Sequence, residues 1–410
     1  MLIAVIPTDP FQKHITGIAE QMKTADAEKM SAITVTKPFM PPLDKYLEYL
    51  KDIWASKNLT NGGPFHQKLE TALAEYLGVP YVCLFNNATL ALIVAMQALR
   101  IQGEVITTPY SFVATAHSVI WNHLTPVFVD IDKDSCCMDP HKIEQAITPK
   151  TSLIMPVHVY GRSCNTRLIG EIANNYGLRC IYDAAHAFGV TDEGGSILRH
   201  GDLSVLSFHA TKVFNTFEGG AIVCNDINMK KRIDYLKNFG FANETKIVAS
   251  GINGKMNELQ AAFGLLQLDY IDEAISKRKA IDSLYRELLN EVPGIRSPEP
   301  WDSATHNYSY FPIFVNTEYP LTRDALYDKL KEAGVHARRY FYPLISNLPI
   351  YSDCSGATAT NLPIANAVAD EVLCLPIYPD LTHDEVVTIS ELVKSSACVS
   401  HHTPSSERVF

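Results

Sequence analysis

The sequence has no apolar run of the roughly 20 residues that a membrane-spanning helix requires. Its opening, from Met1 to Pro7, is apolar but shorter than the core of a signal peptide, and it ends at a proline. We therefore expect no membrane partner and a location in the cytoplasm.

Basic residues are also scarce, since 35 lysines and arginines stand against 45 aspartates and glutamates, a net charge of -10. A face that binds nucleic acid needs the opposite balance, so we expect no nucleic-acid partner. The nine cysteines are scattered without a Cys-x-x-Cys pair, which predicts neither a metal site nor a disulfide framework. No Gly-x-Ser-x-Gly elbow occurs, which disfavours a serine hydrolase.

The composition is that of an ordinary globular protein, with 47% hydrophobic and 20% charged residues over a length of 410. This length favours a large domain and a smaller one. Residues 1–36 lack clear periodicity, and we interpret them as an N-terminal extension, with Met30 as an alternative start. We predict a large domain over residues 37–275, a small α+β domain over 276–397 and a frayed tail over 398–410.

Short apolar runs alternate with helical patterns between residues 81 and 224, which predicts a mostly parallel, seven-stranded sheet with helices on both faces. Ligands of such sheets lie off the carboxyl ends of the strands. The predicted strands are Tyr81–Phe85, Glu104–Thr108, Pro126–Asp130, Leu153–Val157, Arg179–Tyr182, Ser204–Phe208 and Ala221–Cys224. The predicted helices between and after them include residues 89–99, 112–121, 140–146, 166–176 and 257–291.

The segment Asn87-Ala88-Thr89 follows the first of these strands and opens a helix. Such a junction directs backbone N–H groups and the positive end of the helix dipole at an anion. Taken alone, it is more typical of an ordinary helix cap.

A carboxylate, Asp183, follows the strand Arg179–Tyr182, and His186 comes three residues later. A carboxylate at that position, in a partly dry cleft, could pair with a ring nitrogen and keep it protonated. The alternatives are that Asp183 caps a helix and that His186 is a hydrogen-bonded core imidazole.

Lys212 lies just beyond another strand, before the pair Gly219-Gly220. A partly desolvated lysine has a lowered pKa, which suits Schiff-base chemistry, although most loop lysines are simply solvated. The glycine pair indicates a close approach of the backbone to another group.

These segments, in this order, resemble the DegT/DnrJ/EryC1/StrS family of sugar aminotransferases, which belong to the fold-type I pyridoxal-phosphate (PLP) enzymes. The resemblance runs from about Pro38 to Leu392. Besides the Asp183 and Lys212 segments, it rests on residues 103–109, 111–115, 126–132, 156–161 and 253–258.

The resemblance implies pyridoxal 5'-phosphate as cofactor and a homodimer with shared active sites. It implies that Lys212 forms the Schiff base and shuttles a proton. Asp183 would pair with the pyridine nitrogen, and His186 would lie beside the phenolic oxygen. The cofactor would also contact the stacking ring of Phe112, a phosphate cradle of Ala88, Thr89 and Ser207, and Asn253 of the partner subunit.

The chain departs from the family at three places. Ala88 replaces a usual glycine, Asn366 lies where glutamate is frequent, and the extension of residues 1–36 is unusual. For the sugar nucleotide we predict contacts from Asn61, Gly62, Lys255, Arg338, Arg339 and Tyr340. Arginine pairs suit a diphosphate, and the alternative is that Arg338 and Arg339 are a solvated charge pair.

Lys212 favours transamination, because members of the family that dehydrate sugars have histidine there. The stretch from Ser207 to Ala221 looks like that of members which aminate C4 of dTDP-4-keto-6-deoxyglucose with glutamate, a step in surface-polysaccharide synthesis. The alternatives are amination at C3 of a 3-keto sugar nucleotide, or of a UDP sugar. A further one is a protein that has lost catalysis and acts as a binding partner.

Overall fold

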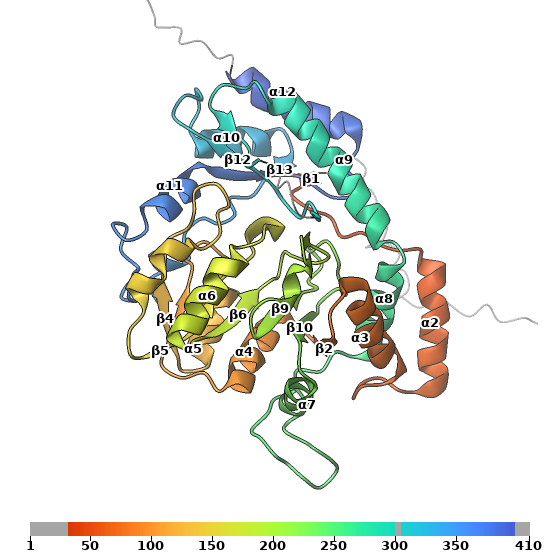
Figure 1. Cartoon of the computed structure of the whole chain (residues 1–410). Coiled ribbons are helices and arrows are strands. Elements are labelled where there is room, and N and C mark those ends of the chain that lie inside the picture. The colour runs from red at the N-terminus through yellow and green to blue at the C-terminus, as the bar shows by residue number, and fades with distance from the viewer. Residues whose placement is uncertain (1–31, 300–304, 398–410) are drawn as a thin grey trace, which may run out of the picture.

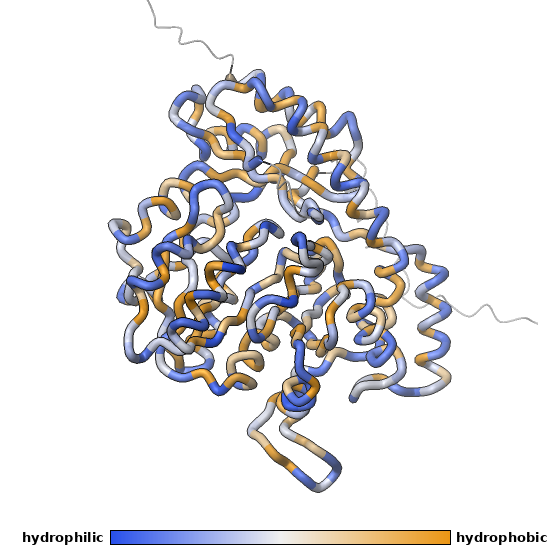
Figure 2. The backbone as a smooth tube through the Cα atoms, viewed as in Figure 1, coloured by the Kyte–Doolittle hydropathy of each residue, from blue (hydrophilic) through white to orange (hydrophobic). Residues whose placement is uncertain are grey.

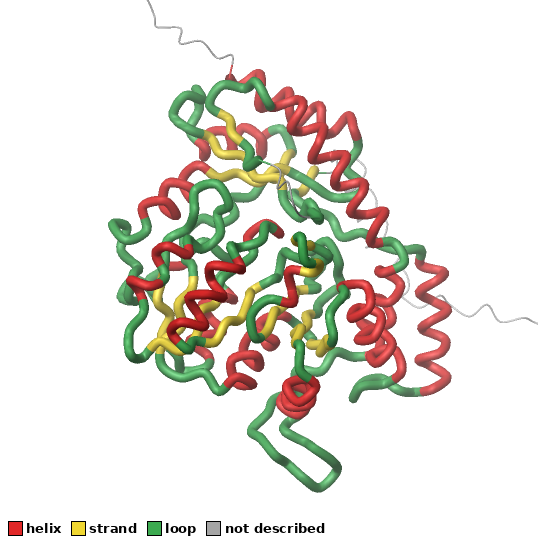
Figure 3. The backbone as a smooth tube through the Cα atoms, in the orientation of Figure 1, coloured by secondary structure: helices red, strands yellow, loops and turns green. Residues whose placement is uncertain are grey.

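The computed structural model describes residues 32–299 and 305–397 of the chain. Strands lie in two groups, one in the middle of the large domain and one in a smaller C-terminal α+β domain (Figure 3). The tail 398–410 and most of the predicted extension lie outside the described residues.

The central sheet has seven strands in the order β2-β10-β9-β6-β5-β3-β4. All neighbours are parallel except β10, which runs antiparallel to β2 and β9. The mostly parallel sheet predicted from the sequence is therefore confirmed. Its strands are β2 (Tyr81–Phe85), β3 (Glu104–Thr107), β4 (Thr125–Phe128), β5 (Thr151–Met155), β6 (Arg179–Asp183), β9 (Leu203–Ser207) and β10 (Gly220–Cys224).

Helices cover both faces of the sheet (Figure 1). Successive apolar residues of each strand point to opposite faces, so both faces must be shielded from water. Along β2, Cys83 and Phe85 join one core cluster, whereas Val82 and Leu84 join another. The first cluster includes residues of α4 (Ala88–Leu99), α5 (Ala114–Trp121) and α7 (Ile227–Leu236). The second includes residues of α2 (Leu43–Ser56), α3 (Pro64–Leu77) and α8 (Glu258–Leu268), and α6 (Thr166–Tyr176) packs in a third.

One predicted helix, over residues 140–146, is wrong. The segment forms two 3-10 turns, η1 (Pro140–Lys142) and η2 (Glu144–Ala146), with the Ile143 N–H bonded to the Pro140 carbonyl. Seven residues are too few to repay the nucleation of an isolated α-helix, and i→i+3 bonds close such short turns.

The C-terminal domain packs a small sheet against helices around its own apolar cluster. Along its outer helices, apolar and polar residues alternate (Figure 2). The boundary predicted between residues 275 and 276 falls inside α9 and stays a prediction. The main elements are α9 (Ile271–Leu289), β11 (Ile295–Arg296), β12 (Phe311–Val315), α10 (Arg323–Glu332), α11 (Pro363–Glu371), β14 (Val372–Leu375) and α12 (His383–Ala397).

Two contacts link segments that are distant in the sequence to the C-terminal domain. Residues of the predicted extension form β1 (Ile33–Thr34), which pairs in parallel with β13 (Val335–His336) of the C-terminal domain. The buried Asp130 carboxylate accepts the backbone N–H groups of Ile364 and Ala365 at the start of α11, at 3.1 and 2.8 Å. An acid of the large domain thus caps a helix of the small one.

Candidate active site

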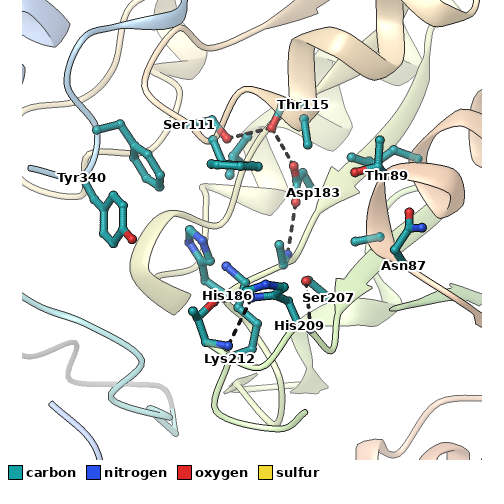
Figure 4. Close-up of a pocket in the computed structure, with 18 of the residues that line it drawn as sticks. Asn87, Thr89, Ser111, Thr115, Asp183, His186, Ser207, His209, Lys212 and Tyr340 are labelled. Carbon is teal, nitrogen blue, oxygen red and sulfur yellow. Dashed lines mark hydrogen bonds between the residues drawn. The ribbon is translucent and has the colours of Figure 1, made fainter. Parts of the chain in front are cut away.

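A cavity of about 250 Å³ opens at the carboxyl ends of the strands, between the two domains (Figure 4). The parallel topology predicts a site at this edge. The cavity is lined by every residue predicted to hold the cofactor from within one chain, namely Ala88, Thr89, Phe112, Asp183, His186, Ser207 and Lys212.

Asp183 ends β6 and has its carboxylate buried in this cavity. One oxygen accepts the Thr115 hydroxyl at 2.8 Å, and the other accepts the Ala185 N–H at 3.1 Å. Burial raises the pKa of Asp183, while these two hydrogen bonds and the charge of Lys212 oppose the rise. The carboxyl is therefore held by fixed donors in a dry environment.

The hydroxyl of Thr115 is itself held by a second hydroxyl, since Ser111 Oγ lies 2.7 Å from Thr115 Oγ1. Both residues are buried and line the cavity (Figure 4). The sequence prediction did not include them as site residues. Ser111 precedes α5 and Thr115 lies in its first turn, and this spacing of four residues is the local signal that could have brought the two hydroxyls together.

Lys212 lies in the loop after β9, and its side chain reaches the same cavity as Asp183 (Figure 4). Burial lowers the pKa of Lys212 to about 8, although the negative charge of Asp183 opposes that change. A fraction of the ε-amine is thus neutral near neutral pH, and a neutral amine is a nucleophile.

The N-terminus of α4 lies at one end of the cavity and has the backbone geometry of an anion-binding cradle. The Asn87 side chain caps the helix by accepting the Leu90 N–H at 2.9 Å, and Ala88 and Thr89 begin it. First-turn N–H groups have no acceptor within their helix, so they can bind an anion. The backbone of β10 runs against this cradle, because a Cβ on Gly220 would lie 2.7 Å from the Ala88 nitrogen. The close approach predicted from the glycine pair is thus present.

His186 lines the cavity but is almost fully buried, because aromatic rings pack against it. Its Nδ1 accepts the Tyr160 N–H at 3.2 Å, and its ring stacks on Phe341 with an interplanar angle of 4°. Burial and the nearby Lys212 hold the pKa of His186 well below its usual range, so the imidazole is neutral. Phe112, by contrast, keeps 60% of its surface exposed while it lines the cavity.

Of the residues predicted to bind the sugar nucleotide, Tyr340 lines the cavity, whereas the others lie outside its lining. Arg339 donates to Asp324 at 2.7 Å and covers the ring of Tyr327, and Arg338 is exposed. The turn with Asn61 and Gly62 precedes α3, whose first N–H groups bond to the buried Glu258 carboxylate.

Asn253 and Lys255 belong to a hairpin arm, residues 238–255, which follows α7 and projects from the large domain (Figure 1). The arm closes through bridges of Asn238 with Asn253 and of Phe241 with Ile247. Its base is fixed beside the cradle, since Asn86, just before the helix cap, donates its N–H to the Gly254 carbonyl at 2.9 Å. Asn253 lies outside the cavity of its own chain.

A family model described as the DegT/DnrJ/EryC1/StrS aminotransferase family matches residues 44–394. The chain belongs to this family. Within the described residues, no group of histidine, cysteine and acidic side chains could hold a metal ion, and no helix is long and apolar enough to cross a bilayer.

Curated relatives and solved structures match the aminotransferase over nearly its whole length. It is 56% identical to the dTDP-4-amino-4,6-dideoxy-D-glucose transaminase of Escherichia coli, over 88% of this chain and 98% of that protein. It is 55% identical to the transaminase of the same name from Shigella dysenteriae, over 86% and 95%. The crystal structure of DesI with its TDP-sugar product superposes with a TM-score of 0.86 and 35% identity, over 90% and 94%.

The protein is a PLP-dependent sugar aminotransferase, and its cavity fits that cofactor. The cradle at Ala88 and Thr89 suits a phosphate, and the buried Asp183 carboxylate suits a protonated ring nitrogen. Lys212 supplies a nucleophilic amine in the same space.

Proposed function

We propose that the enzyme transfers the amino group of glutamate to C4 of dTDP-4-keto-6-deoxyglucose, which gives dTDP-4-amino-4,6-dideoxyglucose for surface-polysaccharide synthesis. The observation that carries this proposal is the shared cavity of Lys212 and Asp183 in a chain that is 56% identical to a transaminase named for that product. We place the reaction in the cytoplasm, which the free cysteines of the described residues support.

Each side chain in the cavity has a separate part in this proposal. When bound, PLP supplies an electron sink that stabilises negative charge on the carbon bearing the nitrogen. The Asp183 carboxylate would keep the ring nitrogen protonated, and His186 would contact the phenolic oxygen. Phe112 would cover the ring, while Ala88, Thr89 and Ser207 would hold the phosphate.

Lys212 has two tasks that its environment supports. Its ε-amine would bond covalently to the cofactor at rest and, once displaced by the donor amine, would carry a proton to and from the substrate carbon. A group with a pKa of about 8 can both accept and release a proton near neutral pH.

We further propose a homodimer in which the arm of one subunit reaches the cavity of the other. Phe241, Ile247 and Val248 expose apolar side chains on the arm, as expected of a surface that a second copy covers. Asn253 would then contact the phosphate bound in the partner subunit, and Lys255 with the turn of Asn61 and Gly62 would contact the nucleotide. Arg338, Arg339 and Tyr340 would complete the substrate site.

Subunit complementation tests this arrangement. Lys212→Ala and Asn253→Ala should each abolish or strongly reduce turnover as homodimers. A reassembled equal mixture should recover about a quarter of wild-type activity, because half of its dimers carry one complete site. Sites built from one chain alone would give no recovery.

The substrate is tested by incubating the enzyme with glutamate and one keto sugar at a time, and locating the new amine by NMR. We expect rapid amination of dTDP-4-keto-6-deoxyglucose and loss of that activity in Lys212→Ala. Faster turnover of a 3-keto or UDP-linked sugar would overturn the proposed specificity. Bound cofactor without turnover of any keto sugar would overturn the enzymatic role.

A further inference from the structure

Tyr310 belongs to the C-terminal domain, yet its hydroxyl meets the lysine of the large domain. It directly precedes β12 and lines the cavity. Lys212 Nζ donates to Tyr310 Oη across 3.4 Å. The sequence prediction did not include Tyr310 among the site residues, because nothing in the local pattern links two residues that are 98 positions apart.

The segment that carries Tyr310 is attached to the large domain by buried side chains. Asn307, which is 2% exposed, donates to the carbonyls of His186 and Phe188 at 2.8 and 2.9 Å. Ser309 Oγ donates to the Tyr160 carbonyl at 2.9 Å. Because these bonds lie one and three residues before Tyr310, the position of its backbone relative to the cavity is fixed by two separate loops.

Neighbouring rings restrict the side chain as well. The Tyr310 ring meets His186 edge-on at 4.9 Å between centroids and Tyr340 edge-on at 5.7 Å. Tyr160 approaches it at 5.7 Å with a tilt of 57°. Burial raises the pKa of Tyr310, so its hydroxyl stays protonated and uncharged at the pH of the reaction.

We propose that Tyr310 is a positioning residue for Lys212, whose hydroxyl oxygen accepts a hydrogen bond from the ε-amine and fixes the direction in which that amine points. The inference rests on the proposed function of Lys212 as proton carrier. The proton moves between the substrate carbon and Nζ, and no bond of Tyr310 breaks. A free lysine side chain has many rotamers, so one fixed acceptor raises the fraction of time that Nζ faces the carbon.

This proposal predicts a split between binding and chemistry in Tyr310→Phe, which removes only the hydroxyl. The kcat should fall roughly tenfold, the factor expected for one ordinary hydrogen bond, whereas KM for the keto sugar should stay within about twofold. Tyr285→Phe is the matched control, because Tyr285 is fully buried in the same domain and its hydroxyl has no hydrogen-bond partner among the described residues. That variant should keep wild-type kcat.

A second readout does not depend on turnover. Loading of PLP onto the cofactor-free, full-length chain requires the neutral ε-amine, so its rate should rise with pH around the pKa of Lys212. An acceptor favours the protonated amine, and its removal in Tyr310→Phe should move this midpoint to lower pH by roughly half a unit. Tyr285→Phe should leave the midpoint in place.

The inference is overturned if Tyr310→Phe matches Tyr285→Phe in both kcat and loading midpoint. Should Tyr310→Phe unfold at a clearly lower temperature than the control, Tyr310→His replaces it. Histidine keeps a ring with a polar nitrogen that can accept a hydrogen bond. Tyr310→His should therefore retain a higher kcat than Tyr310→Phe under the same conditions. An equal loss of kcat in the two variants would count against the proposal. Lys212→Ala separates the two ideas, because residual turnover in that variant would refute the function of Lys212 itself.

Discussion

Thr115→Val removes a hydroxyl from Asp183 while it keeps the branched shape of the side chain. Thr115 Oγ1 donates to the carboxylate at 2.8 Å, and the other bond, from the Ala185 N–H, is longer at 3.1 Å. Without Thr115 the buried carboxylate loses its shorter donor. Its charged form becomes less stable, so the pKa of Asp183 must rise further.

The size of the effect follows from the charge of the acceptor. A hydrogen bond to a charged group contributes about 1.5–3 kcal/mol, which is a factor of roughly 10 to 100 in the ionisation equilibrium. If Asp183 must be ionised to keep the ring nitrogen protonated, kcat on the acidic side of the pH profile should fall about 10- to 100-fold. The acidic limb of the pH profile should move to higher pH.

The stability of the cofactor-free chain gives an independent measure. Burial already raises the folded pKa of Asp183 above its unfolded value, so the folded chain is favoured at low pH. That advantage is lost as the pH rises through the folded pKa. In Thr115→Val the folded pKa is higher still, so this loss of stability should continue to a higher pH than in the wild type. Urea unfolding between about pH 4 and 8 would detect the difference.

The control is Thr107→Val, since the Thr107 hydroxyl is equally buried but donates to the Met155 carbonyl. It should lose about 1 kcal/mol of stability with an unchanged acidic limb. The reasoning is refuted if Thr115→Val keeps kcat within about twofold and its acidic limb coincides with that of the control.

Two further experiments test the cradle, with a glycine substitution and its control, and the lysine, in the wild-type chain. Gly220→Ala should weaken PLP binding at least roughly tenfold in a spectroscopic titration, because its Cβ would lie 2.7 Å from the Ala88 nitrogen. A variant that binds PLP with wild-type affinity would contradict the close approach. Gly170→Ala, in open space on α6, should instead leave binding unchanged and raise stability by about 0.5–1 kcal/mol in thermal unfolding. Because the pKa of Lys212 is lowered to about 8, the rate of PLP loading of the wild-type chain should have its pH midpoint near 8. A midpoint near the pKa of a solvated lysine would show that the ε-amine is not desolvated.

The sequence predicted the parts of the site that depend on strand order. Asp183, Lys212 and the Ala88–Thr89 junction each follow an apolar strand, and parallel strands bring such positions to one edge. The strand bounds deviate by one or two residues, because the ends of a strand depend on its neighbours.

Contacts between distant segments were not predictable from one sequence. Tyr310 approaches Lys212 from a segment that Asn307 and Ser309 attach to backbone carbonyls of the large domain. Thr115 acts on Asp183 from a different strand–helix unit. Such contacts are decided by how whole elements pack, and local periodicity carries no information about them.

The Asp130 carboxylate sets a limit on how far the two domains can part. A hinge motion that lifts α11 from the sheet would remove two N–H donors from a buried carboxylate, leaving it the ion pair with Lys142 at 2.9 Å. A hydrogen bond to a charged group contributes about 1.5–3 kcal/mol, so losing both N–H donors is costly for a buried carboxylate. This cost opposes hinge opening at α11 as a route for substrates into the catalytic chamber.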